Sequence, residues 1–132
     1  MNLNDKSKAR LEGVHSDLVV VVLRAAEISP IDFIITEGAR TIEKQKTLVA
    51  KGASKTMRSR HIPEMNECGV ACAVDLAAVI DGEVRWDWAL YDQLAGAMKQ
   101  AASDLKITIE WGGDWVSFKD GPHFQLPWKV VP

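Results

Sequence analysis

The chain has 132 residues, of which 47% are hydrophobic and 26% are charged, and its formal net charge is −2. This length suits one domain over residues 1–132 with no separate wall-binding domain, and the composition excludes a largely disordered chain. The small negative charge and the lack of a basic run argue against nucleic-acid binding. The first 15 residues lack the apolar core of a signal peptide, and no apolar run is long enough for stable membrane insertion.

The first third of the chain is expected to be mainly helical. A short helix over 4–12 is followed by a second helix that begins near Ser16, a good N-cap residue. Apolar residues then keep helical spacing as far as Ile28. The segment 19–22 is β-branched and is also compatible with a strand, but the helical spacing continues on both sides and favours a helix.

Strands and helices alternate after Pro30. Residues 32–37 form a candidate buried strand, and a third helix begins near Thr41 and stops at Gly52. A polar stretch then leads into a second strand candidate over 71–79. These elements indicate a mixed chain in which the sheet is built around a few short strands.

The clearest helix begins after Asp87 and carries an apolar stripe at steps of three and four residues. The stripe, which we expect to face the core, consists of Trp88, Tyr91, Leu94, Ala95, Met98, Ala101 and Leu105. Strands are expected over 107–111 and 122–126, on either side of a Gly-Gly turn. Helices first and mostly antiparallel strands later predict an α+β fold, with N-terminal helices packed on a small sheet.

Only three histidines occur, and two of them combine with an aspartate to suggest a metal site. His61 lies in SRH, His123 in DGPHFQL, and Asp75 is surrounded by apolar residues in CAVDLAA. A buried carboxylate is costly unless it is paired or binds a metal. Catalytic zinc takes three protein ligands from such residues and keeps one position free. The alternative is that Asp75 faces solvent on an alternating strand.

Asp120 precedes His123 by three residues, with Gly121-Pro122 between them. In a regular strand, residues three apart point to opposite faces, but the Gly-Pro pair breaks that regularity. Asp120 and His123 are therefore free to converge on one site, where a carboxylate that is not a metal ligand is placed to act as a general base. The alternative is an ordinary Asp-Gly-Pro turn.

Four separated segments resemble the zinc peptidases of the D-Ala-D-Ala carboxypeptidase and L-Ala-D-Glu endopeptidase family. The family pattern S-x-H, A-x-D, W-G-G-D-W and D/E-x-x-H-F is matched, in order, by SRH, AVDLAA, EWGGDW and FKDGPHFQL. The stretches RLEGVHSDLVVVVLRAAEIS and ITEGARTIEKQ also look like the start of such proteins, so the resemblance covers nearly the whole chain. Single-domain phage endolysins are the most similar members, and the implied fold is that of Hedgehog and D-Ala-D-Ala peptidases.

Taken residue by residue, the resemblance implies three zinc ligands, a catalytic acid/base and a cation near the reacting carbonyl or a substrate carboxylate. These are His61, Asp75 and His123 as ligands, Asp120 as the acid/base and Arg40 as the cation. Ser59 matches a position near the substrate, whereas Asp114 and Trp115 match the loop that shapes the cleft.

The main departure from the family pattern is the spacing of the first two ligands. Asp75 follows His61 by 14 residues, whereas seven is common in the family, so a segment near 62–68 must loop out. Cys68 and Cys72, expected to be free thiols, then become rival ligands, because thiolates bind zinc well. Cys72, however, lies an odd number of residues before Asp75 and should point to the opposite strand face.

The remaining histidine and the tryptophans allow further predictions. His15 stands beside a helix start, and we expect it to hold that turn by a hydrogen bond instead of binding metal. Trp88 lies on the apolar stripe and is expected in the core. Trp111 and Trp115 flank the Gly-Gly turn and are expected to line a groove beside the site.

The resemblance implies a monomeric, zinc-dependent peptidase that cleaves the peptidoglycan stem peptide, at the L-Ala-D-Glu bond, during phage-induced lysis of the host. Such a protein would accumulate in the host cytoplasm and reach the wall through a pore made by another protein. Two alternatives stay open: a D-Ala-D-Ala carboxypeptidase, and a non-catalytic module that binds peptidoglycan peptides. A binding module has no use for a base beside the metal, so Asp120 favours an enzyme.

Overall fold

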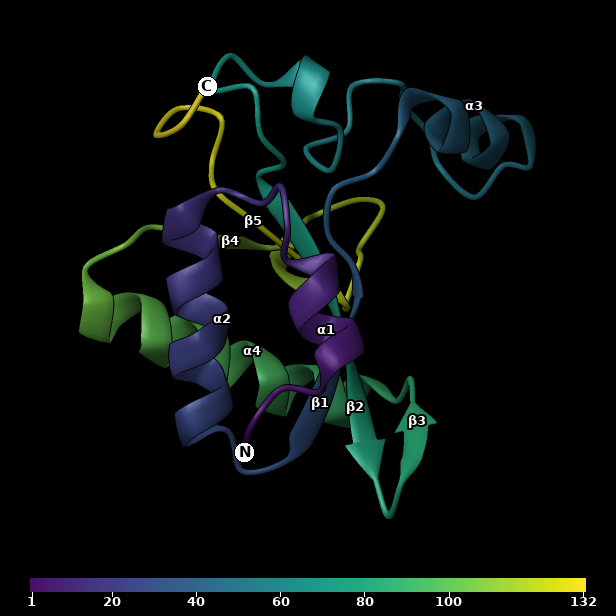
Figure 1. Ribbon diagram of the computed structural model, residues 1–132. Helices are drawn as coiled ribbons and strands as arrows, with labels where there is room; N and C mark the ends of the chain where they lie inside the picture. Colours follow the sequence, from purple (N-terminus) through teal and green to yellow (C-terminus); the bar gives the residue numbers. More distant parts are fainter.

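A five-stranded antiparallel sheet organises the fold (Figure 1). The computed structural model describes residues 1–132. Its strands are β1 (Asp32–Glu37), β2 (Ala73–Ile80), β3 (Glu83–Arg85), β4 (Glu110–Trp111) and β5 (His123–Gln125). The order is β1-β2-β5-β4, and β3 pairs with β2 beyond the end of β5. The longest strand, β2, therefore lies at the centre and contacts three others.

The chain also forms four α-helices: α1 (Asp5–Arg10), α2 (Ser16–Ile28), α3 (Ile42–Ala50) and α4 (Trp88–Leu105). Helices α2 and α4 pack against each other on one side of the molecule, α4 also contacts β2, and α1 packs on β1. Figure 1 shows α3 standing apart, beyond the end of the sheet. Single turns of 3-10 helix lie at Pro63–Met65 and Gly112–Asp114. The α+β prediction is confirmed.

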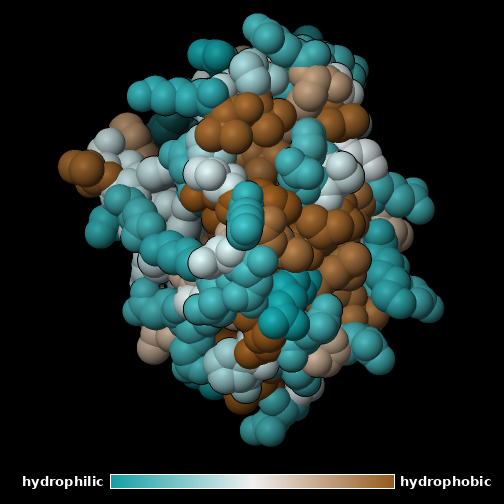
Figure 2. All heavy atoms as spheres, turned by 90° about the vertical axis from the view of Figure 1, so that its left-hand side faces the viewer, coloured by the Kyte–Doolittle hydropathy of each residue, from teal (hydrophilic) through white to brown (hydrophobic).

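The core lies between the sheet and the pair α2 and α4. Buried side chains come from both helices and from the inner faces of β1, β2 and β5: Leu18, Val21, Val22, Leu94, Met98, Phe33, Leu76 and Phe124. The β-branched run of α2 is helical because its valines at 21 and 22 reach this core. Figure 2, which views the α2 and α4 side, shows apolar patches among polar side chains, and Val20 and Leu23 of α2 are partly exposed.

The helices α2 and α3 begin where the sequence predicts, but the residue that caps α2 differs from the predicted one. Helix α2 begins at Ser16, yet its N-cap is His15, whose Nδ1 accepts a hydrogen bond from the Asp17 backbone N–H at 3.0 Å. The predicted Ser16 cap is therefore wrong, whereas the turn-holding hydrogen bond of His15 is confirmed. Thr41 caps α3 as expected, with its hydroxyl accepting from the Lys44 N–H.

The prediction that the apolar stripe of α4 faces the core is correct for the middle of the helix and wrong at its two ends. The stripe residues from Tyr91 to Ala101 are buried, but Trp88 is 49% exposed and Leu105 is 39% exposed. The helix is longer than the core it covers, so its first and last turns extend past the sheet. Trp88 instead packs edge-to-face on Tyr91, with ring centroids 5.3 Å apart. The strand predicted over 107–111 is also shorter, because only its last two residues pair with β5.

Candidate metal centre

The side chains of His61, Asp75 and His123 converge at one end of the sheet. His61 Nε2 and His123 Nδ1 each lie 3.2 Å from Asp75 Oδ1, and one donor atom from each residue lies within 4.8 Å of the others. Asp75 and His123 are direct cross-strand partners on β2 and β5, while His61 comes from the long connection after α3. Asp75 is therefore turned toward the histidines, and its predicted alternative orientation into solvent is excluded.

The second nitrogen of each imidazole is held by the protein. His61 Nδ1–H donates to the Gly38 carbonyl at 2.8 Å, and His123 Nε2–H donates to Gln125 Oε1 at 2.8 Å. These bonds orient both rings so that the Asp75-facing nitrogens, once deprotonated, can bind a metal, which is the arrangement that metal-binding histidines require. Position 38 has no room for a side chain, because a Cβ there would stand 1.9 Å from the Arg10 carbonyl oxygen.

Burial and charge shift the pKa values of the cluster in opposite directions. Burial alone would raise the pKa of Asp75, but the charge of His61 and hydrogen bonds from both imidazoles hold it far below its usual value. Burial alone would lower the pKa of His123, but its hydrogen bond to Asp75 and the charge of that carboxylate raise it. Without a metal, the site is thus an ionised acid next to a histidine that readily holds a proton.

The segment between the first two ligands is folded around one buried asparagine. Asn66 Nδ2 donates to the carbonyls of Ile62 (3.3 Å) and Val70 (2.8 Å) and to that of Arg60 (3.1 Å). Its Oδ1 accepts from the Arg60 guanidinium at 2.6 Å. These bonds close the extra residues into a loop, and the His61 side chain remains directed at Asp75 despite the longer spacing.

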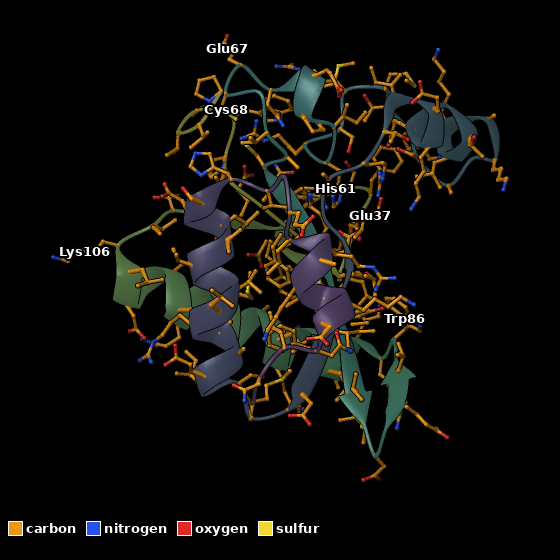
Figure 3. All side chains as sticks on the ribbon, in the orientation of Figure 1. Glu37, His61, Glu67, Cys68, Trp86 and Lys106 are labelled. Carbon is orange, nitrogen blue, oxygen red and sulfur yellow. The ribbon has the colours of Figure 1, made fainter.

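Arg40 reaches the same cluster from the start of α3. Its Nε donates to Glu37 at 3.0 Å, one terminal nitrogen donates to the buried Gln45 at 2.8 Å, and the other lies 4.0 Å from Asp75 Oδ2. Burial alone would raise the pKa of Glu37, but hydrogen bonds from Lys44 and Arg40 lower it. Figure 3 shows Glu37 and His61 at the same end of the sheet. The guanidinium is therefore fixed beside the cluster.

A cleft of about 770 Å³ opens over the cluster, between the segment that follows α3 and the loop before β5. Besides Arg40 and the three residues of the cluster, three further predicted site residues line it: Ser59, Trp115 and Asp120. Ser59 Oγ accepts from the His61 backbone N–H at 3.2 Å, and the Trp115 ring lies 5.3 Å from the His123 ring. Partial burial and the negative charge of Asp75 raise the pKa of Asp120, whose side chain faces the cleft.

Two residues of the W-G-G-D-W segment lie elsewhere. Asp114 pairs with Lys99 of α4 at 2.7 Å and does not line the cleft. Trp111 is only 8% exposed, and its Nε1–H donates to the Gly121 carbonyl at 2.7 Å. The prediction that Trp111 lines a groove is therefore wrong, because its ring anchors the loop from beneath, stacked on Phe124.

The cysteines lie apart from the cluster. Cys68 Sγ and Cys72 Sγ are 3.4 Å from each other, and both thiols are free. Burial and the hydrogen bond with Cys68 raise the pKa of Cys72 to about 12, which disfavours the thiolate that zinc binds. Figure 3 shows Cys68 well away from His61. The donor set of the cluster is thus two imidazoles and one carboxylate.

The residues that support the cluster were not predicted from the sequence. Gln125 orients His123, and Gln45 and Glu37 orient Arg40. The contact of Gln125 with His123 could have been predicted, because residues two apart on a strand share a face and Gln125 follows His123 by two. The contact of Gln45 with Arg40 could not have been predicted, because it depends on how α3 is placed.

Comparison with known proteins places this geometry in a family. The family model described as "Phage L-alanyl-D-glutamate peptidase" matches residues 1–126. The chain is similar to the L-alanyl-D-glutamate peptidase of Listeria phage A118, with 38% identity over 79% of this chain, but it spans only 34% of that protein's length.

Two solved structures show the same fold. The L-Ala D-Glu endopeptidase ChiX of Serratia marcescens superposes with a TM-score of 0.86 at 40% identity, covering 98% of this chain and 92% of ChiX. The vancomycin-resistance D,D-dipeptidase VanXYg, at 18% identity, matches with a TM-score of 0.50 over 84% of this chain and 49% of its own, a likeness of fold alone.

None of the helices is both long enough and apolar enough to cross a bilayer.

Proposed function

The chain belongs to the phage L-alanyl-D-glutamate peptidase family, and from this membership we propose that it hydrolyses the L-Ala-D-Glu bond of the peptidoglycan stem peptide. The observation that carries the proposal is the convergence of His61, Asp75 and His123 beneath a cleft that also holds Asp120. The proposed role is that of an endolysin acting as a monomer, made in the host cytoplasm and reaching the wall through a pore formed by another protein.

Zinc is the proposed cofactor, because the donor set suits it. Two imidazole nitrogens and one carboxylate oxygen are typical of catalytic zinc, whereas calcium and magnesium prefer oxygen ligands alone. His61 and His123 each donate from the ring nitrogen that faces away from the cluster, so the cluster-facing nitrogen is the one that can bind a metal once it is deprotonated. Zinc bound by these residues and Asp75 would supply Lewis acidity toward the scissile carbonyl and the attacking water.

Asp120 is the proposed acid/base. Its carboxylate would accept a proton from the attacking water as the water oxygen bonds to the alanine carbonyl carbon. As the C–N bond breaks, the carboxyl would return that proton to the glutamate amine, so Asp120 ends ionised as it began. The raised pKa of Asp120 suits both halves of this cycle, because it brings the carboxyl closer to the operating pH.

Arg40 is the proposed electrostatic partner of the growing oxyanion. Its guanidinium is held by Glu37 and Gln45 next to Asp75, so no reorganisation is needed when negative charge develops on the carbonyl oxygen. Ser59 and Trp115 are proposed to contact the substrate from the cleft walls. Asp114 is proposed to act on the cleft indirectly, by tying its loop to α4 through Lys99.

The test is mass spectrometry of fragments released from purified peptidoglycan by the zinc-loaded protein. We expect cuts between L-Ala and D-Glu, loss of cutting after chelation, and recovery on adding zinc. Cleavage of terminal D-Ala-D-Ala instead would make the chain a carboxypeptidase. Binding without any released fragment, at full zinc loading, would make it a binding module and overturn the proposal.

A further inference from the structure

The cleft over the metal centre has a charge balance opposite to that of the whole chain. The chain carries 16 basic and 18 acidic residues. The cleft, by contrast, is lined by five basic residues and two acidic ones: Arg40, Lys55, Arg58, Arg60 and Lys119 against Asp75 and Asp120. Basic side chains have therefore been concentrated around the site of a molecule that is acidic elsewhere.

Two of these five cations are occupied within the protein. Arg40 is held by Glu37 and Gln45, and Arg60 is buried, donating to the Leu126 and Val131 carbonyls. The other three, Lys55, Arg58 and Lys119, are exposed and make no ion pair or side-chain hydrogen bond. We call these three residues the cationic rim.

Arg58 is the member of the rim whose orientation is fixed. Its guanidinium lies 4.2 Å from the centroid of the Trp128 ring, which also contacts Arg60 at 4.1 Å. This contact with the indole face uses none of the guanidinium N–H groups, so they stay available to a planar, two-oxygen anion. Lys55 lies over the Phe118 ring at 5.9 Å, so the segment after α3 approaches the loop before β5 at the rim.

The proposed substrate carries an anion close to the bond that is cut. A glutamate residue carries two carboxyl groups, and the peptide chain continues through only one of them. The other is a free carboxylate on the leaving-group side of the scissile bond. A guanidinium pairs with a carboxylate through two parallel hydrogen bonds, a stronger contact than one with a neutral amide.

We propose that the cationic rim, led by Arg58, recognises free carboxylates of the stem peptide and makes the chain selective for the carboxylate form over the carboxamide form. This inference rests on the proposed function. Lys55 and Lys119 add longer-range attraction that salt weakens, and Arg58 supplies the directional contact. The selectivity therefore appears mainly in KM and decreases as ionic strength increases.

The test uses two synthetic peptides that share the L-Ala-D-Glu bond and have amidated C-termini, and that differ only in whether the free glutamate carboxyl is a carboxylate or a carboxamide. For the zinc-loaded wild type we expect kcat/KM about tenfold higher for the carboxylate peptide, the size typical of one charge-assisted hydrogen bond. In R58Q the ratio of the two kcat/KM values should fall to about one. The control K106Q, at the far end of α4 in Figure 3, should keep the wild-type ratio.

The outcomes separate this inference from the proposed function. If the wild type cleaves neither peptide, the proposed function fails. If it cleaves both equally well, or if R58Q retains the tenfold preference, the rim is not the recognition element and the inference is overturned. Should R58Q lose its fold by circular dichroism, R58K, which keeps the charge but not the planar fork, takes its place, and an undiminished tenfold ratio there would also overturn the inference.

Discussion

At the scale of single residues, the two imidazoles and the Arg40 guanidinium are each held by a group outside the metal cluster. Gly38 and Gln125 fix the two imidazoles, and Glu37 and Gln45 fix Arg40. Asp120 differs, because no side-chain hydrogen bond holds its carboxylate and it faces the cleft. This freedom fits a group that must take up a proton from one atom and release it to another.

Replacement of Asp120 by asparagine should separate metal binding from catalysis. Asparagine has the same shape but accepts no proton, so we expect D120N to bind one zinc per chain and to lose about 10²–10⁴-fold in kcat. Zinc content by atomic spectroscopy and peptide cleavage provide the two measurements. D92N, an equally conservative change at an exposed position of α4, should keep full activity. Full activity in D120N would remove it from the acid/base role.

At the scale of elements, the sequence was informative wherever a pattern depends on neighbours along the chain. The helical spacing through α2 and the middle of α4 follows from residues three and four apart meeting the same core. The short strands were harder, because β4 pairs over only two residues and its extent is set by β5. The prediction that Trp111 lines a groove failed for the same reason, because only the placement of Phe124 shows that the Trp111 ring faces inward.

The residues of the site were easier to predict than the limits of the strands, because chemistry restricts which residue types can form such a site. Two histidines and one aspartate in separate motifs suggested a metal site, and the family resemblance named them as its ligands, although their distances came only with the fold. The supporting residues Gln45 and Asn66 were not predictable, because each satisfies backbone or side-chain groups whose positions depend on tertiary structure.

The loop that contains Asn66 yields a prediction about an element. Alanine at 66 would leave the Arg60 guanidinium and three carbonyls short of a buried partner. We expect N66A to lower the free energy of unfolding by about 1–3 kcal/mol, measured by denaturant titration. Zinc affinity should fall as well, because His61 immediately precedes this loop.

The matched change for N66A is E64A, which lies in the same loop but is exposed. We expect E64A to change the free energy of unfolding by less than about 0.5 kcal/mol. Equal stability of N66A and E64A would show that the loop does not depend on the asparagine.

At the scale of the whole molecule, stability and metal binding are coupled through protons. The pKa of His123 is raised above 6.5, so without metal its interaction with Asp75 stabilises the fold fully below pH 6.5 and is lost as pH rises through the folded-state pKa. The pKa of Asp75 is lowered from 3.8, so its contribution is present above pH 3.8 and is lost as pH falls through the folded-state pKa. The metal-free protein should be most stable between these limits.

Zinc reverses the alkaline half of this profile. A metal needs the His123 nitrogen without its proton, so protons and zinc compete, and zinc affinity rises with pH over the range in which the metal-free fold weakens. We therefore expect the increase in Tm on adding zinc to grow steadily between pH 5.5 and 8.5, with at most about 1.4 kcal/mol of extra stabilisation per pH unit for each displaced proton. Paired thermal scans with zinc and with chelator measure the difference, and a pH-independent increase would show that zinc displaces no proton from the cluster.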